Sequence, residues 1–358
     1  MLLGLLYMRA LVKKSVEKYD MALMDLPVPE VQAGEVLVKV TAGSICGSDL
    51  HMYLGHKGYS WVDYPIVLGH EVTGSVEAVG NEVDKAILGK RVVVNPYIPC
   101  NRCENCVNSR ENICEAGTRT LTAPPRSLQF GFRKNGGMAE YMVVPGDNVL
   151  PVGDGVPDSI AAILESIAVG VHAVNKAGEI KNQDIVIFGP GPIGLGITAV
   201  CKGLGANRII VAGLSDDQGR LEIAEKLGAI ALTINDNDFS NIITLLQENP
   251  ARVIFDCSGH PSVPENSIHV LKKGGELILV GISTGKFSLP MDYMVRGEIC
   301  IKGTYGTNKE SFLQAINYAG LPQFTYEHII THKFKLEESV AAFEAARAKK
   351  GAKVLIYP

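Results

Sequence analysis

Four closely spaced cysteines carry the most specific chemical signal in the sequence. They follow the spacing Cys-x2-Cys-x2-Cys-x7-Cys and are Cys100, Cys103, Cys106 and Cys114. Four thiolates at such short intervals can surround one tetrahedral zinc ion, and a zinc site made only of cysteines is closed and structural. An iron–sulfur cluster uses the same type of ligand, but the intervening residues give no further indication of one. We therefore predict a structural zinc lobe over about residues 96–115.

A second group of metal-binding residue types is spread over three segments. It comprises Cys46, His70 with the adjacent Glu71, and Glu165. One thiolate, one imidazole and carboxylates can hold zinc while a further position stays open to water or substrate, which distinguishes catalytic zinc from structural zinc. The sequence thus predicts a catalytic zinc site built from these residues.

Three polar residues follow Cys46 directly and are suited to assist at such a site. Ser48 and His51 lie close behind the cysteine, and we predict that they pass a proton from a substrate hydroxyl to solvent. Asp49 is suited to hold the ligand histidine in place by a hydrogen bond from outside the metal shell. The segment therefore combines a metal ligand with a proton path.

A glycine-rich turn predicts a dinucleotide site. The sequence Gly-Pro-Gly-Pro-Ile-Gly at 189–194 follows an apolar strand and opens an apolar helix. Glycines let the backbone approach a pyrophosphate, which binds at the helix N-terminus because free N–H groups and the helix dipole favour anions. The predicted contacts come from Gly189, Gly191, Pro192, Ile193 and Gly194.

The end of the next strand bears on the choice between NAD and NADP. An acidic residue is expected there to bind the adenosine ribose hydroxyls, but the chain has Gly213, followed by Ser215. This glycine removes one reason to exclude NADP. No Arg or Lys follows Gly213 at once to hold a 2′-phosphate, and Arg220 comes only several residues later. Asp216 and Asp217 would repel the phosphate. We expect NAD as the cofactor with NADP as the alternative, and contacts from Gly213, Ser215 and Arg220.

The elements that must position these residues change character near Ser159. Before it, short β-rich segments (36–40, 72–79 and 91–94 are typical) are separated by Gly, Pro and Asn, which predicts a mostly antiparallel, barrel-like unit. After it, strands alternate with helices, which predicts βαβ units and hence an α/β domain with a doubly wound parallel sheet. The expected helices are 160–176, 193–204 and 219–227, the expected strands are 184–188, 208–212, 251–256 and 276–280, and a helical region from about 306 ends in a strand at 353–357.

Composition limits the classes of protein to consider. The chain has 358 residues, 46% of them hydrophobic and 20% charged, and its net charge is −4. These values fit a folded globular protein with no attraction to nucleic acid or anionic lipid, and no apolar run is long enough to span a membrane. Eight cysteines, four of them clustered, indicate metal rather than disulfides and favour the cytoplasm. Leu2–Met8 is interpreted as an N-terminal extension, and Asn235–Asp238 as a solvated loop.

Taken together, the motifs resemble the zinc-containing medium-chain dehydrogenase/reductase family, which includes alcohol, sorbitol and threonine dehydrogenases. The resemblance runs from about Met8 to near the end of the chain, and it depends on 46–51, 69–71, 137–141, 189–194 and the four-cysteine lobe. It implies a GroES-like β-barrel catalytic domain (1–163), a Rossmann cofactor domain (164–304) and a C-terminal return to the catalytic domain (305–358). It also implies that Cys46, His70 and Glu165 are zinc ligands and that Glu71 can join or exchange with zinc-bound water.

Within this family the substrate stays open. Alcohol dehydrogenases have a second cysteine where this chain has Glu165, and a glutamate there is similar to sorbitol and other polyol dehydrogenases. Those enzymes usually have an aromatic residue where this chain has Met52, and an arginine in the segment that corresponds to 303–306. The segment Ile301–Gly306 instead looks like threonine dehydrogenase.

The implied function is hydride transfer between a secondary alcohol (a polyol, sugar alcohol or diol) and NAD(P), with one catalytic and one structural zinc ion. A threonine-type amino-alcohol dehydrogenase is the alternative. A quinone or enone reductase without zinc is disfavoured, and a non-catalytic dinucleotide-binding protein is the alternative from another class. The family resemblance further implies a homodimer or homotetramer, with an exposed strand near 281–304 that extends a sheet across a dimer axis.

Overall fold

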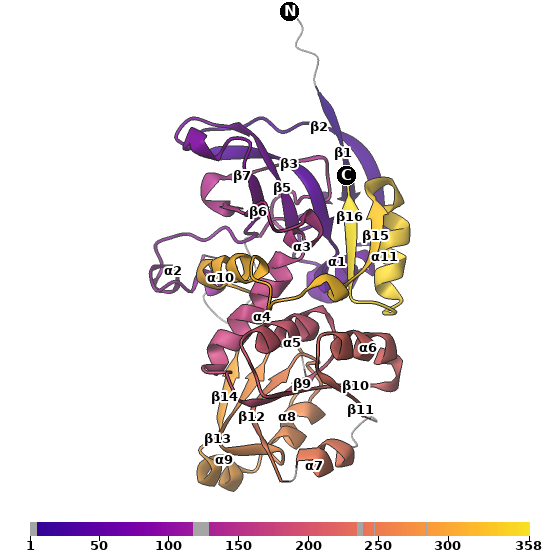
Figure 1. Ribbon diagram of the computed structural model, residues 1–358. Coiled ribbons are helices and arrows are strands. Elements are labelled where there is room, and N and C mark those ends of the chain that lie inside the picture. Colours follow the sequence, from indigo (N-terminus) through magenta and orange to yellow (C-terminus); the bar gives the residue numbers. More distant parts are fainter. Residues whose placement is uncertain (1–5, 117–128, 235–238, 247, 284) are drawn as a thin grey trace, which may run out of the picture. The chain divides into compact units, whose positions relative to one another are not determined.

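The computed structural model describes residues 6–116, 129–234, 239–246, 248–283 and 285–358 (Figure 1). The loop predicted at Asn235–Asp238 and most of the N-terminal extension lie outside these residues. Contacts between Cα atoms divide the chain into two compact units. The first contains Met1–Glu165, Asn308–Ile316 and Ile330–Pro358, and the second contains Ser166–Thr307 and Asn317–Ile329. Residues 317–329 thus group with the second unit, although they lie within the 305–358 segment that the family resemblance returns to the catalytic domain.

The first unit is built mainly from antiparallel strands. A three-stranded sheet has the order β2-β1-β4, and a seven-stranded sheet has the order β15-β16-β3-β5-β6-β8 with β7 paired to β3. The strands are β1 (Tyr7–Lys13), β2 (Met21–Pro27), β3 (Glu35–Ser44), β4 (Ile66–Val67), β5 (Glu71–Val79), β6 (Arg91–Val94), β7 (Tyr141–Pro145), β8 (Val149–Pro151), β15 (Ile330–Lys335) and β16 (Lys353–Tyr357). Valines that alternate along β3, β5 and β6 form a buried core, as the period of a half-buried strand requires.

Short helices complete this unit. They are α1 (Gly47–Tyr53), α2 (Glu104–Val107), α3 (Asp158–Ala161), the first residues of α10 (Lys309–Ala319), and α11 (Ser339–Arg347). Strands β15 and β16 pair in parallel, so the unit is not entirely antiparallel. The helical interpretation after residue 306 was wrong for β15, whose side chains alternate between half-buried and exposed along the whole strand.

The second unit contains the predicted doubly wound sheet. Its six parallel strands have the order β11-β10-β9-β12-β13-β14, with α5 and α6 on one face and α7 and α8 on the other (Figure 1). The bounds are α4 (Leu164–Ala177), β9 (Asp184–Phe188), α5 (Pro192–Gly203), β10 (Arg208–Gly213), α6 (Gln218–Lys226), β11 (Ile230–Thr233), α7 (Ser240–Leu246), β12 (Ala251–Asp256), α8 (Ser262–Ser267), β13 (Leu271–Leu279), α9 (Met291–Gly297) and β14 (Cys300–Gly303). The strand order reverses between β9 and β12, which is where such sheets bind ligands at their carboxyl ends.

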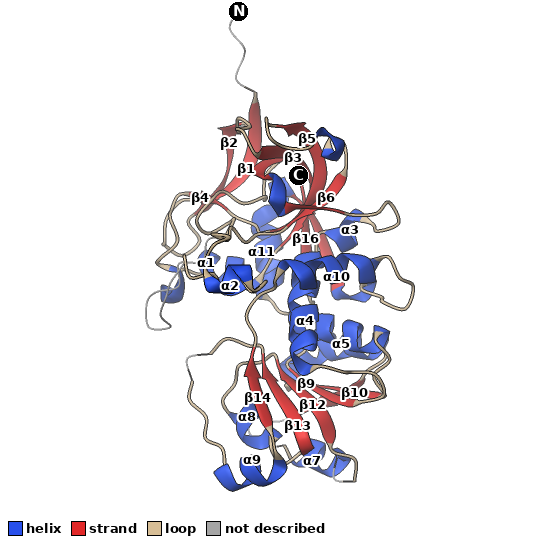
Figure 2. Ribbon diagram, turned by 90° about the vertical axis from the view of Figure 1, so that its left-hand side faces the viewer, coloured by secondary structure: helices blue, strands red, loops and turns tan. Residues whose placement is uncertain are grey.

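Most expected elements occur in the structure, and two of the differences in their limits have identifiable causes. The predicted helix 160–176 is divided into α3 and α4, because the Ile163 N–H donates to the carbonyl of Ile160 and so ends the first helix with a tight turn. Strand β13 begins at Leu271 rather than at residue 276, because Leu271 already pairs with Ala251 before the register shifts. Figure 2 shows the parallel strands of the second unit in red between their helices.

Candidate active site

The sheet of the first unit brings Cys46, His70 and Glu71 together. Cys46 follows β3 and precedes α1, whereas His70 and Glu71 stand at the start of β5, and Ser44 of β3 pairs directly with Glu71. The thiolate, the imidazole and the carboxylate each offer a ligand atom, and these atoms lie within 4.8 Å of one another. Gly69 makes the turn before them with φ of +93°, where a Cβ would lie 2.7 Å from Met138 Cγ. The sharp turn therefore requires glycine.

Asp49 lies next to both the cysteine and the histidine. Its Oδ2 accepts a hydrogen bond of 2.9 Å from the Cys46 N–H, and its Oδ1 lies 3.8 Å from His70 Nδ1. Both Oδ1 and Nδ1 are buried and have no hydrogen-bond partner among the described residues. A carboxylate behind one ring nitrogen leaves the other free to bind a metal, which is the usual arrangement of a metal-binding histidine.

Glu71 is held by a residue that the sequence did not reveal. Lys353 Nζ, at the start of β16, donates to Glu71 Oε1 at 2.5 Å and also contacts Oε2, and the Ser44 hydroxyl donates to Oε2. Glu71 and Lys353 are both almost fully buried. Burial alone would raise the pKa of Glu71, but the charges of Lys353 and His70 and the hydrogen bonds from Lys353 and Ser44 together outweigh it and lower this pKa. Glu71 is therefore an ionised carboxylate in a buried ion pair.

Glu165 lies beside this group but is not one of its three members. It is the second residue of α4 and is buried. Burial raises the pKa of its carboxyl to about 7, and the charges of His70 and Glu71 also act on it. The structure thus brings the ligand atoms of three of the four predicted metal-binding residues within 4.8 Å of one another and places the fourth close enough to interact electrostatically with His70 and Glu71.

The charges around His70 fit a cation. Burial alone lowers the pKa of His70, but the charges of Asp49 and Cys46 outweigh it and raise this pKa to about 10. Glu71 and Glu165 add further carboxylates, and the ammonium of Lys353 offsets only part of this negative charge. A divalent ion would compensate this excess of negative charge and displace the proton from His70. The residues present therefore fit zinc, which binds thiolate, imidazole and carboxylate.

The two predicted proton carriers share helix α1. Ser48 Oγ is buried and has no hydrogen-bond partner among the described residues, so it can bind a polar group of a ligand. His51, three residues later, is exposed, lies with its Nδ1 2.7 Å from His56 Nδ1 and stacks on Tyr59. Residues three apart share a helix face, which supports a path from Ser48 towards solvent.

An aromatic group beside His70 was not found from the sequence. The ring of Phe132 lies 5.1 Å from the ring of His70, and Trp61 stacks on Phe132 with centroids 5.8 Å apart. Arg133 lies over the ring of Trp61, with its guanidinium carbon 5.1 Å from the ring centroid. No local motif marks these residues, since Trp61 and Phe132 meet only through the fold. They place apolar rings beside His70 and thus beside the group of Cys46, His70 and Glu71.

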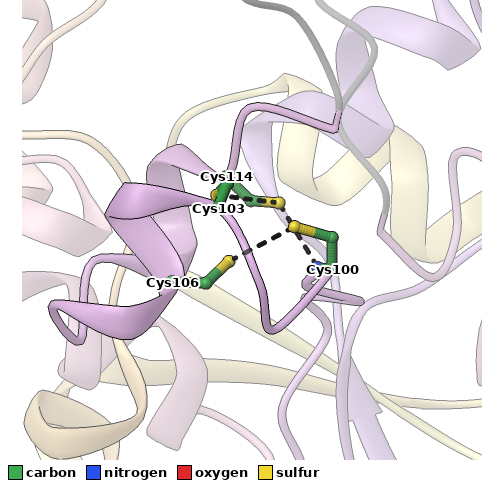
Figure 3. A group of neighbouring side chains, drawn as sticks. All are labelled: Cys100, Cys103, Cys106 and Cys114. Atoms are coloured by element: carbon green, nitrogen blue, oxygen red, sulfur yellow. Dashed lines mark hydrogen bonds between the residues drawn. The ribbon is translucent and has the colours of Figure 1, made fainter.

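The four-cysteine lobe is folded around one point (Figure 3). The four sulfur atoms lie within 4.8 Å of one another, with Cys100 and Cys106 at 3.9 Å and Cys103 and Cys114 at 4.0 Å. A tetrahedral zinc site with Zn–S bonds of about 2.3 Å requires sulfur atoms about 3.8 Å apart, so the spacing fits one zinc ion. Backbone N–H groups of Arg102 and Cys103 lower the pKa of Cys100 to about 6, which favours its thiolate. Burial raises the pKa of Cys106 to about 12 and also raises that of Cys114, so a bound zinc ion would have to displace their protons.

The glycine-rich turn has the geometry of a phosphate cradle. Gly189 has φ of +93° and its Cβ would lie 3.0 Å from the Ser258 N atom, while a Cβ on Gly194 would lie 2.1 Å from the Gly189 carbonyl oxygen. Gly191 precedes α5 and has open space where a Cβ would point, and Pro192 is the first helical residue. The turn leaves room for a pyrophosphate at the N-terminus of a twelve-residue helix.

Two family models match this chain, one in each of its two parts. The model of the alcohol dehydrogenase GroES-like domain matches residues 32–154, and that of the zinc-binding dehydrogenase matches residues 192–319. Sorbitol dehydrogenase of Bacillus subtilis (strain 168) is 33% identical over 345 residues, which are 95% of this chain and 94% of the relative. The chain belongs to the zinc-containing medium-chain dehydrogenase/reductase family. L-threonine 3-dehydrogenase of Aeromonas salmonicida (strain A449), another member, is 30% identical over 354 residues, 98% of this chain and 99% of the relative.

A solved structure supports the same assignment. An alcohol dehydrogenase from Escherichia coli CFT073, crystallised with NADH, has a TM-score of 0.87 and 28% identity, and the match covers 98% of this chain and 99% of that one. The predicted fold, a GroES-like domain with a Rossmann domain, is thus confirmed, as is the predicted dehydrogenase family.

In the part of the chain that the structure describes, no helix has the length and apolar character needed to cross a membrane.

The cradle of this dehydrogenase gives a first prediction. Replacing Gly194 by alanine is expected to weaken NADH binding by at least about tenfold, because the methyl group would collide with the Gly189 carbonyl and displace the turn. Fluorescence titration of the nucleotide measures this effect. Gly153→Ala is the matched control, since a Cβ there meets nothing within 4 Å. Equal affinities in the two variants would contradict the proposed role of the turn.

The lobe gives a second prediction. Cys103→Ser is expected to remove one zinc ion per chain and to lower Tm by roughly 4–8 °C, as a loss of about 2 kcal/mol does in a domain of this size. The lobe is tied to the start of α10, where Asn308 Nδ2 donates to the Ser109 carbonyl at 2.8 Å, so its loss should loosen that contact as well. Metal analysis and thermal unfolding measure the effect, with the exposed Cys300→Ser as control. Unchanged zinc content in Cys103→Ser would exclude this site.

Proposed function

We propose that the protein oxidises a secondary alcohol of the polyol, sugar-alcohol or diol class to a ketone, with NAD as hydride acceptor. The observation that carries this proposal is the convergence of Cys46, His70 and Glu71 on one buried point with an excess of negative charge. A zinc ion bound there supplies a Lewis acid that lowers the pKa of a substrate hydroxyl. Cys46, His70 and Glu165 are the proposed ligands.

The residues around the metal group have separate proposed tasks. Asp49 holds the His70 ring in orientation, and Lys353 holds Glu71 as an ionised carboxylate beside the ligands. The Ser48 hydroxyl would accept the proton of the alcohol as it donates its own towards His51, which passes a proton to solvent. NAD, when bound, would accept the hydride from the carbon that bears the substrate hydroxyl. Phe132 offers an apolar surface next to His70, which suits the carbon chain of the substrate and excludes water.

The polyol class is favoured over simple alcohols by Glu165. The family's alcohol dehydrogenases have cysteine at this position, and the 33% identical relative is a sorbitol dehydrogenase. The second candidate is an amino-alcohol substrate of the threonine type. It is supported by the segment Ile301–Gly306 and by the threonine dehydrogenase that is 30% identical over 98% of the chain.

We further propose that the protein is cytoplasmic and forms a homodimer or homotetramer. Strand β14 ends the six-stranded sheet as far as the described residues show, and the adjacent α9 exposes Met291 and Val295. An unpaired strand edge beside exposed apolar side chains is a natural surface for a second copy.

For the domains, we propose that residues 1–163 and the C-terminal segment 305–358 form the catalytic domain, and that residues 164–304 form the cofactor domain.

The deciding experiment follows the appearance of reduced nicotinamide with NAD and NADP separately. The substrates are sorbitol, xylitol, 2,3-butanediol and threonine, each with and without a zinc chelator. Turnover of a polyol or diol that the chelator abolishes would support the proposal, whereas turnover of threonine alone would favour the second candidate. If nothing reacts while two zinc ions per chain and a bound nucleotide are measured, the proposed substrate classes are wrong.

A further inference from the structure

The end of β10 has no room for the acidic residue that usually binds the adenosine ribose. A Cβ on Gly213 would lie 2.8 Å from Pro190 Cγ and 2.9 Å from Pro190 Cδ. Contacts under 3.0 Å require something to move, and a proline ring in a tight turn has little freedom to do so. Gly213 is therefore a steric requirement of this particular turn, and a ribose-binding acid must come from another position.

Asp217 occupies that neighbourhood. Its Cβ lies 3.2 Å from the point where a Gly213 Cβ would be. Its Oδ2 accepts a hydrogen bond of 3.2 Å from the Leu214 N–H, and its own N–H donates to the Leu214 carbonyl at 2.9 Å. These two bonds close the loop after β10 and fix the carboxylate beside the strand end. Only the bond from the Leu214 N–H uses the carboxylate, which has about four acceptor positions, so other positions remain for ribose hydroxyls.

Arg220 does not offer a free cation for a 2′-phosphate. Its Nη1 lies 3.6 Å from Asp217 Oδ1, and its side chain is only 14% exposed. Burial lowers the pKa of the guanidinium while Asp217 raises it, as expected for a cation that is partly withdrawn from water and compensated by its neighbour. A phosphate placed here would meet the Asp217 carboxylate at the same time.

We propose that Asp217 replaces the missing acid at the end of β10, binds the adenosine ribose hydroxyls of NAD, and excludes NADP by repelling its 2′-phosphate. This inference rests on the proposed dinucleotide site. It assigns the cofactor preference to a residue four positions beyond the usual one, because the loop between Leu214 and Asp217 folds back on the strand.

The test measures binding of NADH and NADPH without any alcohol present, by fluorescence titration of the purified full chain. The wild-type protein should bind NADH at least about tenfold more tightly than NADPH. Asp217→Asn removes the charge with little change in size. It is expected to weaken NADH binding by about 10- to 100-fold, the usual effect of losing a hydrogen bond to a charged group, and to bring NADPH to an affinity equal to or above that of NADH.

Asp216→Asn is the matched control. It removes the same charge from the neighbouring residue, whose side chain is exposed. It should leave the preference for NADH within about twofold of wild type. Asp217→Ser, which keeps a short acceptor for the Leu214 N–H, provides a second variant if Asp217→Asn does not fold by circular dichroism. It should lose the preference in the same way.

The possible results separate this inference from the proposed function. An unchanged preference in both Asp217 variants, or a wild-type protein that prefers NADPH, would overturn the role of Asp217. Failure of wild type to bind either nucleotide would overturn the dinucleotide site itself and the inference with it. A changed preference in a protein that turns over none of the tested alcohols would support the inference and count only against the proposed substrates.

Discussion

Cys46→Ser is expected to remove one zinc ion per chain and to lower kcat/KM for the best alcohol by at least about a thousandfold. Serine keeps the approximate size of cysteine but replaces a thiolate by a neutral hydroxyl, which is a far weaker zinc ligand. A Lewis acid supplies several kcal/mol to the transition state, and each 1.36 kcal/mol corresponds to tenfold in rate. Metal analysis and steady-state kinetics of the same preparation measure both effects.

Binding of NADH gives this experiment its second readout. The nucleotide contacts proposed above come from the second unit, so the Kd of NADH should stay within a few-fold of wild type. Cys300→Ser makes the same chemical change at an exposed strand edge, and it should alter neither zinc content nor rate. A Cys46→Ser protein that keeps full activity would contradict the metal mechanism. A wild-type protein that binds NADH, lacks this zinc ion and turns over no alcohol would point to the non-catalytic alternative.

Local motifs made much of the site predictable from the sequence. Cys46 and Ser48 lie within three positions of one another, and His70 adjoins Glu71, so their residue types and order are visible without a fold. The same holds for the four cysteines and for the turn at 189–194. In each case the chemistry is set by spacing along the chain, because the ligands lie on one turn, one strand end or one short loop.

Partners that meet only through sheet register could not be predicted in this way. Lys353 is 282 residues from Glu71, and it reaches the site because β16 pairs with β3, where Leu355 faces Ser44. A lysine in the otherwise apolar strand 353–357 was the one available signal, since a lysine is rarely fully buried unless it is paired. Phe132 had no signal of this kind. The motifs can be recognised from the order of residues along the chain. The residues that surround them are brought there by the pairing of strands that are distant in the sequence.

Lys353→Met is expected to lower the free energy of unfolding by about 3–5 kcal/mol, the usual cost of leaving one member of a buried ion pair uncompensated. Lys353 is 2% exposed and Glu71 is fully buried, and Lys353 Nζ lies 2.5 Å from Glu71 Oε1. Methionine fills a similar space without the charge, so the loss reports the unpaired Glu71 carboxylate rather than a cavity. Urea unfolding of the chelator-treated protein measures the change without a contribution from metal binding.

Removing the second charge should recover much of this stability. In the Lys353→Met/Glu71→Gln double variant no buried charge remains unpaired at this position, so the two substitutions together should cost less than the sum of their separate effects. Lys333→Met, on the exposed side of the neighbouring strand β15, is the control and should change stability by less than about 0.5 kcal/mol. Additive losses in the double variant would show that Lys353 and Glu71 act independently. Coupling between them would instead mean that Lys353 holds Glu71 charged and fixed beside the residues that could bind the metal.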